Sequence, residues 1–187
     1  MPLTQLDESS ALILIDLQKG VVGLPMADST SDVVQRAARL VHGFHERGMP
    51  VVVVNVTGMA PGRTDAGSFR PELPPDWTEL VPELEFLPGD HHVSKQRWGA
   101  FLGTDLQDFL QSRGITQVVI AGIATSVGVE STARCAYDLG YHVALVLDAM
   151  TDRDADAHRH CQEKIFPRIG ETTTTEEVLN VLKGTVE

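Results

Sequence analysis

The sequence is poor in cysteine and in basic residues, and both shortages exclude certain classes of protein. Only two cysteines, Cys135 and Cys161, occur among 187 residues, and they do not form a CxxC pair. A disulfide framework is therefore excluded, and we expect a reduced, cytoplasmic protein. The 15 basic residues are outnumbered by 26 acidic ones, so the formal net charge is -11. Without a basic stripe, we expect no nucleic-acid partner and no membrane partner.

Long hydrophobic runs are absent as well. No apolar run approaches the roughly 20 residues of a transmembrane helix. The first ten residues, MPLTQLDESS, lack the basic and apolar regions of a signal peptide. Hydrophobic residues nevertheless make up 42% of the chain, which is typical of a folded globular protein. The length predicts a single domain over residues 1–187.

Short apolar segments alternate with amphipathic ones along the chain. They predict strands at 11–16, 51–56, 91–95, 117–122 and 142–148. Helices are predicted at 32–47, 104–114, 129–139 and 154–166, with a last helix inside 172–182. Two of these helices start with capping-box pairs, Thr104 with Gln107 and Thr173 with Glu176. Repeated strand–helix units predict an α/β fold with a parallel sheet and helices on both faces.

The segment 57–88 breaks this alternation. It holds six prolines and three glycines, and we expect a long loop with one short helix at 76–80. A loop of this length inside a compact domain is usually a functional feature or a lid.

Ligands of parallel sheets bind beyond the carboxyl ends of the strands. That rule selects Asp16, Lys95 and the turn 122–128, GIATSVG. A partly desolvated carboxylate at Asp16 suits proton transfer, and an ammonium at Lys95 would keep it ionised or stabilise negative charge. Alternatively, Asp16 only ends its strand and Lys95 is a solvated surface residue.

The turn itself offers backbone N–H groups at a helix N-terminus. Ala124, Thr125 and Ser126 could therefore bind a substrate oxygen or carboxylate, or Thr125 or Ser126 could simply cap the helix. Neither the GxxxxGK[ST] nor the GxGxxG pattern is present, so the turn is not a phosphate loop.

These three features, in this order, resemble the isochorismatase-like hydrolase superfamily, which includes cysteine hydrolases such as nicotinamidases. The matching segments are LILIDLQKG (12–20), KQRWGAFLGTDLQDFLQSRGI (95–115) and VVIAGIATSVGVESTARCAYDLGYHVALVLDAM (118–150). The resemblance covers nearly the whole chain except 57–88. It implies a three-layer α/β/α fold with a mostly parallel six-stranded sheet and a cis peptide at Ile123–Ala124. It also implies a homo-oligomer, a dimer or tetramer, in which a neighbouring subunit closes the pocket.

The chain departs from the cysteine hydrolases at their nucleophile, because the matching position is Gly128. In those enzymes an Asp matching Asp16 is the base and a Lys matching Lys95 completes the triad. Glycine has no side chain, so thioester chemistry at this position is excluded. Cys135 lies seven residues further along a predicted helix, about 10 Å away. We interpret it as a small buried residue rather than a substitute nucleophile.

The isochorismatases proper resemble this pattern more closely, since they keep the Asp and Lys and have glycine at the cysteine site. They cleave a vinyl ether, with the Asp protonating the enol-ether carbon before water attacks. We therefore expect a hydrolase that uses Asp16 and Lys95 without a cysteine nucleophile. That subfamily has a bulky YAH-type stretch at 124–126, so a different substrate is expected here. A catalytically silent small-molecule binding protein, or an amide hydrolase with an unassigned nucleophile, remain alternatives.

Five further residues are candidates for lining a substrate pocket: Asn55, Arg63, Arg97, Trp98 and Phe101. An arginine could grip a substrate carboxylate bidentately, or could form a surface ion pair. Nicotinamidases bind a metal through an Asp-x-His motif and a further His after the second strand. The corresponding segment 55–65, NVTGMAPGRTD, has no histidine, so we expect no metal and no cofactor.

Overall fold

The computed structural model describes residues 3–65 and 73–184. The strands are β1 (Ser10–Ile15), β2 (Val51–Val56), β3 (His91–Lys95), β4 (Gln117–Ile123), β5 (His142–Thr151) and β6 (Glu171–Thr173). The longer helices are α2 (Thr30–Glu46), α3 (Leu106–Ser112), α4 (Glu130–Asp138), α5 (Ala155–His160) and α7 (Thr175–Lys183). Shorter helical segments are α1 (Lys19–Val22), η1 (Pro82–Leu84), η2 (Thr125–Val129), η3 (Cys161–Ile165) and α6 (Phe166–Ile169). Within these described ranges, no helix is both long and apolar enough to cross a membrane.

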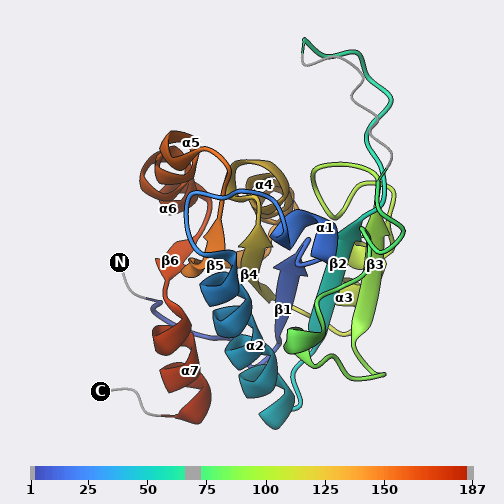
Figure 1. Cartoon of the computed structure of the whole chain (residues 1–187). Coiled ribbons are helices and arrows are strands. Elements are labelled where there is room, and N and C mark those ends of the chain that lie inside the picture. The colour runs from blue at the N-terminus through green and yellow to red at the C-terminus, as the bar shows by residue number, and fades with distance from the viewer. Residues whose placement is uncertain (1–2, 66–72, 185–187) are drawn as a thin grey trace.

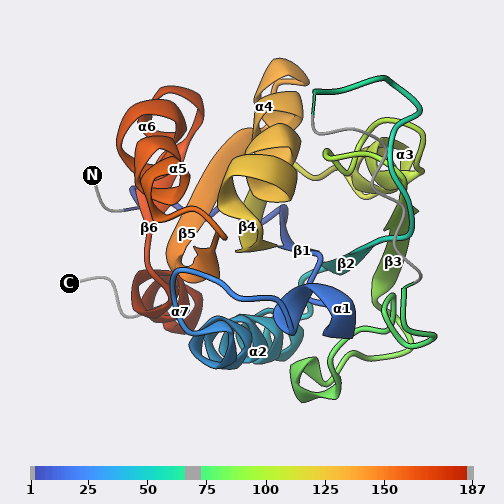
Figure 2. The same cartoon turned by 45° about the horizontal axis from the view of Figure 1, so that its top comes forward.

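The strands form one parallel sheet in the order β3-β2-β1-β4-β5-β6. Strands β2 and β3 follow on one side of β1, and β4, β5 and β6 follow on its other side. Helices α2 and α7 cover one face of the sheet, and α3, α4 and α6 cover the other (Figure 1, Figure 2). The expected three-layer α/β/α fold with a six-stranded sheet is confirmed.

Alternate residues of the central strand face the two helical layers. Leu12 and Leu14 belong to the hydrophobic cluster that includes α2 and α7. Ile13 and Ile15 belong to the cluster that includes α3 and α4. All six residues of β1 are buried, as expected of a parallel strand covered on both faces. The continuous apolar run before Asp16 therefore reflects the two-sided core.

Three local predictions are wrong. The segment 75–78 is a turn rather than part of a helix, and the short helix of this region is η1. Helix α3 begins at Leu106 after Asp105, whose side chain makes no cap bond. Thr104 accepts the N–H of Leu106 at 3.3 Å rather than that of Gln107, so the predicted capping box is absent. The last helix has its capping box one residue later than predicted, with Thr174 and Glu177. Thr173 instead pairs with β5 as the end of β6.

The proline-rich segment after β2 has two described limbs, an outgoing one at 57–65 and a returning one that starts at 73. Residues 66–72 between them lie outside the described residues. Residues 57–65 rise away from the body of the domain (Figure 1). The returning limb is bound to the chain that follows β1, because the N–H of Gly20 donates to the carbonyl of Trp77 at 3.1 Å. The side-chain amide of the buried Gln18 donates to the same carbonyl at 2.9 Å and to that of Val56 at 3.1 Å. This limb is therefore a fixed part of the domain.

Candidate active site

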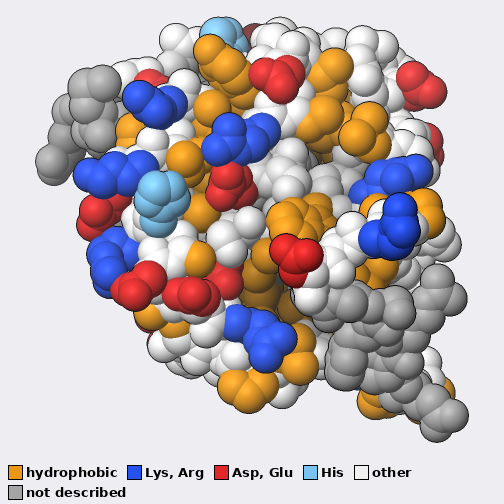
Figure 3. All heavy atoms as spheres, turned by 90° about the horizontal axis from the view of Figure 1, so that it is seen from above, with side chains coloured by type: hydrophobic (Ala, Val, Ile, Leu, Met, Phe, Trp, Pro, Cys, Tyr) orange, Lys and Arg blue, Asp and Glu red, His pale blue; other side chains and the backbone are white. Residues whose placement is uncertain are grey.

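The candidate site lies where the strand order reverses, at the carboxyl ends of β1 and β4. Open parallel sheets form a crevice at this point because the chain leaves the two strands in opposite directions. Asp16 follows β1, η2 follows β4, and Lys95 is the last residue of β3. Figure 3 looks onto this end of the molecule, where hydrophobic side chains lie among acidic and basic ones.

Asp16 and Lys95 form a buried ion pair. The Lys95 Nζ donates a hydrogen bond to Oδ2 of Asp16 at 2.7 Å. Lys95 is only 2% exposed and Asp16 only 6%. The same ammonium donates to the backbone carbonyl of Arg97 at 3.2 Å. Among the described residues, Oδ1 of Asp16 is a buried side-chain oxygen without a hydrogen-bond partner. The pair thus leaves one buried carboxyl oxygen without a hydrogen-bond partner in the described part of the chain.

Burial controls the protonation of Asp16. It raises the pKa of this carboxyl from 3.8 to about 6, although the charge of Lys95 and its hydrogen bond lower it. Desolvation disfavours the charged form of an acid, and here it outweighs the nearby ammonium. Because Oδ2 accepts from Lys95, a proton on Asp16 belongs on Oδ1. Asp16 is therefore suited to exchange a proton with a bound molecule near pH 6.

Gly128 lies directly against this pair. A Cβ atom on Gly128 would be 3.1 Å from Oδ2 of Asp16, 3.6 Å from Nζ of Lys95 and 2.8 Å from Cγ2 of Ile15. The three residues selected by the sequence therefore converge in space. Since no side chain projects from position 128, this position contributes closely packed backbone but no nucleophile. The peptide Ile123–Ala124 before the turn is cis, as the resemblance implies.

The polar side chains of the turn are used inside the protein. The Thr125 hydroxyl donates to the carbonyl of Thr151 at 3.1 Å and lies 2.7 Å from Nδ1 of His158. The N–H and hydroxyl of Ser126 both donate to Oδ2 of Asp152, at 2.7 and 2.8 Å. These contacts hold the turn in place. They do not support the expectation that the Thr125 and Ser126 side chains bind substrate.

Ala124 and Asn55 are also tied into the fold. The Ala124 carbonyl accepts the N–H groups of Val127 and Val129, at 3.1 and 3.2 Å. The amide of Asn55 donates to the carbonyl of Thr78 at 2.9 Å, and its oxygen accepts the hydroxyl of Ser94 at 2.7 Å. Asn55 is buried and fixes the returning limb of the loop to the sheet, and its role in lining a pocket stays a prediction.

The remaining lining candidates lie in different surroundings, and their contact with a ligand stays a prediction. Phe101 is buried in the hydrophobic cluster that includes α3 and α4, and its ring centroid lies 6.2 Å from that of Tyr141. Arg97 is exposed and meets the ion pair through its backbone carbonyl. Trp98 is 60% exposed. Arg63 is exposed on the limb that rises away from the domain.

Sequence reasoning missed three residues that shape the site, namely Gln18, Asp152 and His158. Asp152 follows β5 as Asp16 follows β1, so the rule on strand ends could have selected it. Gln18 follows Asp16 by two residues, but a single glutamine carries no sequence signal for burial. His158 lies on α5, and only the packing of α5 against the turn brings it to Thr125.

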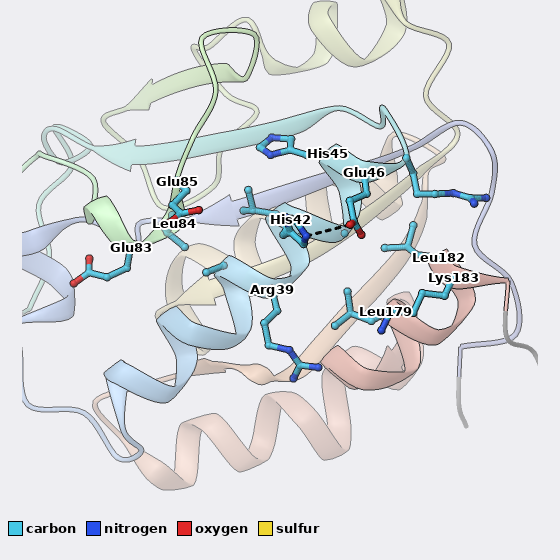
Figure 4. A pocket seen from close by; sticks show the side chains of 14 residues that line it. Arg39, His42, His45, Glu46, Glu83, Leu84, Glu85, Leu179, Leu182 and Lys183 are labelled. Carbon is cyan, nitrogen blue, oxygen red and sulfur yellow. Dashed lines mark ion pairs between the residues drawn. The ribbon is translucent and has the colours of Figure 1, made fainter.

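Other places for a ligand fit less well. A pocket of about 520 Å³ lies between α2, η1 and α7, with Leu84, Leu179 and Leu182 on its walls (Figure 4). On its rim His42 lies 3.2 Å from Glu46, and Arg39 pairs with Glu176 at 2.6 Å. Unlike the carboxyl ends of β1 and β4, this pocket does not lie at the switch point of the sheet, where ligands of such folds bind. In the described part of the chain, no group of three His, Cys, Asp or Glu side chains is arranged to hold a metal ion.

The fold and the site point to one class of protein. A doubly wound parallel sheet with a buried Asp–Lys pair against a glycine at its switch point is the arrangement that the resemblance to isochorismatase-like hydrolases implies. The family model described as "Isochorismatase domain" matches residues 10–177. The chain belongs to the isochorismatase family.

Similar proteins agree with this assignment. An uncharacterized isochorismatase family protein, YwoC of Bacillus subtilis (strain 168), is 43% identical over 94% of this chain and 95% of its own length. A solved isochorismatase family protein from Burkholderia thailandensis has a TM-score of 0.91 and 41% identity, covering 95% of this chain and 97% of that one. Maleamate amidohydrolase of Pseudomonas putida is more distant, with 28% identity over 92% of this chain and 86% of its own.

Proposed function

We propose that this protein hydrolyses a small organic molecule by acid–base catalysis, with Asp16 and Lys95 as catalytic residues and without a covalent enzyme intermediate. One observation carries the proposal. The buried Asp16 has a free Oδ1 and a raised pKa, and it lies beside a position, Gly128, that has no nucleophile. A carboxyl that holds a proton near pH 6 can act as a general acid.

Vinyl-ether cleavage is the reaction that this arrangement suits best. Asp16 delivers the proton on Oδ1 to the terminal alkene carbon, and the ether carbon becomes an oxocarbenium ion. Water adds to that carbon and loses a proton to the Asp16 carboxylate, and the resulting hemiketal breaks down to a carbonyl compound and an alcohol. Lys95 stabilises the Asp16 carboxylate left by proton transfer. No step requires a side chain at position 128.

Amide hydrolysis is the second candidate, because the chain is similar to a maleamate amidohydrolase. The cysteines do not favour it. Burial raises the pKa of both thiols, that of Cys161 to about 12, so neither is a ready thiolate. Ser126 is the half-buried hydroxyl of the turn that lies beside a carboxylate, that of Asp152. An amidase mechanism would have to use Ser126 or water.

Turnover of a panel of vinyl ethers and small amides separates these candidates. We expect wild-type protein to cleave at least one vinyl ether and Asp16→Asn to lose at least 100-fold in kcat, since general acid catalysis contributes about 10²–10⁴. Asp108→Asn, an exposed carboxyl on α3, is the control and should keep full activity. Unchanged turnover in Asp16→Asn contradicts the mechanism. An adduct with an acylating probe that Ser126→Ala abolishes would favour the amidase. Ligand binding without any product would favour a silent binding protein.

A further inference from the structure

Thr125 and His158 have the spacing of a hydroxyl nucleophile and its base. The Thr125 Oγ1 lies 2.7 Å from Nδ1 of His158, and Nε2 of His158 lies 3.7 Å from Oδ2 of Asp28. However, Thr125 has no exposed surface, and its hydroxyl also faces the carbonyl of Thr151. A hydroxyl that points into the interior cannot reach a substrate. The pair therefore serves another purpose than nucleophilic attack.

The hydrogen-bond partners of His158 define its protonation. A carbonyl oxygen only accepts, so the single hydroxyl hydrogen of Thr125 goes to Thr151, and Nδ1 of His158 must donate to Thr125. On the other side of the ring, the amide nitrogen of Gln162 lies 2.8 Å from Nε2. An amide nitrogen only donates, so Nε2 must accept. The Asp28 carboxylate also faces Nε2 but, at 3.7 Å, lies beyond hydrogen-bond distance. The two hydrogen bonds therefore agree on a neutral imidazole with its hydrogen on Nδ1.

We propose that His158 is a positioning residue that, as the neutral Nδ1–H imidazole, fixes Thr125 and thereby holds the turn that presents Gly128 to Asp16. Thr125 begins η2, and Gly128 lies three residues further along the same helical turn. The catalytic meaning of this role rests on the function proposed above. The hydrogen bonds themselves do not depend on that function.

The packing around the turn explains why its position matters. Asp152, which follows β5, accepts the N–H of Ser126. His158, on α5, is hydrogen-bonded to the hydroxyl of Thr125. The backbone of Gly128 covers Asp16, since a Cβ there would be only 3.1 Å from Oδ2. If the hydrogen bond to Thr125 is lost, the turn can shift and water reaches Asp16. The burial that raises the pKa of Asp16 is then reduced, and this pKa falls toward 3.8.

Two substitutions at one position test the proposal. In His158→Asn the amide nitrogen takes the place of Nδ1 and can still donate to Thr125. In His158→Gln the amide is one carbon further out and loses that bond. His160→Asn, on the exposed side of α5, is the matched control. The measurements are the carbonyl-carbon NMR titration of Asp16 and the ¹⁵N shifts of the His158 ring, neither of which requires a substrate.

We expect the wild-type ring to show the Nδ1–H tautomer at pH 7.5. The Asp16 titration should stay near 6 in His158→Asn and in the control, and should move down by one unit or more in His158→Gln. Thr125→Val removes the hydroxyl at nearly constant shape and should lower the Asp16 titration by the same amount. Combining Thr125→Val with His158→Gln should lower it no further.

The proposal is overturned by an Nε2–H or doubly protonated ring in wild-type protein, or by an unchanged Asp16 titration in both His158→Gln and Thr125→Val. It is also overturned if His158→Asn shifts the titration as much as His158→Gln does. Turnover tells this result apart from a failure of the proposed function. If Asp16→Asn keeps wild-type turnover while the titrations behave as expected, the acid–base function fails and the role of His158 stands.

Discussion

Lys95 donates to one oxygen of Asp16 at 2.7 Å and leaves the other oxygen without a partner among the described residues. The two residues are 79 positions apart in the chain and are joined across the end of the sheet. This asymmetry distinguishes the two carboxyl oxygens, because Oδ2 is held by the ammonium and the proposed mechanism places the transferred proton on Oδ1.

Replacing Lys95 by methionine should raise the pKa of Asp16 further. Methionine keeps an unbranched side chain, one heavy atom shorter, but removes the charge and the hydrogen bond that lower this pKa. We expect a rise of about 1–3 units, the usual effect of a neighbouring cation on a carboxyl. Carbonyl-carbon NMR titration of Asp16 measures it. Lys19→Met removes an exposed lysine that pairs with Glu79 and should leave the titration in place. A fall in the pKa of Asp16 would contradict the pairing.

Activity should decline as the pH rises through about 6. In the proposed mechanism the protonated form of Asp16 is the proton donor. Because the pKa of Asp16 is raised to about 6, this form predominates below that pH and is lost above it. The rate should fall about tenfold per pH unit on the alkaline side. A pH profile of kcat/KM checks this prediction. A rate that increases with pH through the same range would instead identify Asp16 as a base.

Gly128→Ala should destabilise the fold and reduce activity. The added methyl would lie 2.8 Å from Cγ2 of Ile15 and 3.1 Å from Oδ2 of Asp16, so neighbouring atoms must move. Overpacking of this kind costs about 1–3 kcal/mol. Urea denaturation measures the loss. Gly89→Ala is the control, because a methyl there meets no atom within 4 Å. Equal stability of the two variants would mean that the turn yields easily at position 128.

Asp152→Asn should loosen the turn without touching the ion pair. The N–H and hydroxyl of Ser126 both donate to Oδ2 of Asp152, and an amide nitrogen in that place cannot accept. Losing a charged acceptor in a buried site costs about 1–3 kcal/mol. Denaturation and amide hydrogen exchange at Ser126 report the change. Asp138→Asn, at an exposed position of α4, should behave like wild-type protein. Unchanged protection of the Ser126 amide would show that Asp152 does not hold the turn.

Much of the fold could be predicted because local patterns carry it. The apolar run 11–15 and the β-branched run 51–54 are buried on both faces, and each predicted strand is present. The errors occur where local signals are ambiguous. Four consecutive threonines allow two capping registers, and pairing of Thr173 with Val146 in β5 selects one. The short β6 has no periodicity of its own and exists because β5 offers it an edge. The oligomeric state stays a prediction.

The sequence by itself determined the alternation of strands and helices, the positions of Asp16 and Lys95 at strand ends, and the lack of a nucleophile at Gly128. Residue type and period express these features locally. Only the tertiary structure decided that Lys95 reaches Asp16, that Asp16 is desolvated enough to hold a proton near pH 6, and that Thr125 points inward to His158. Such features depend on distances and burial between distant parts of the chain, and these arise only when the layers pack together.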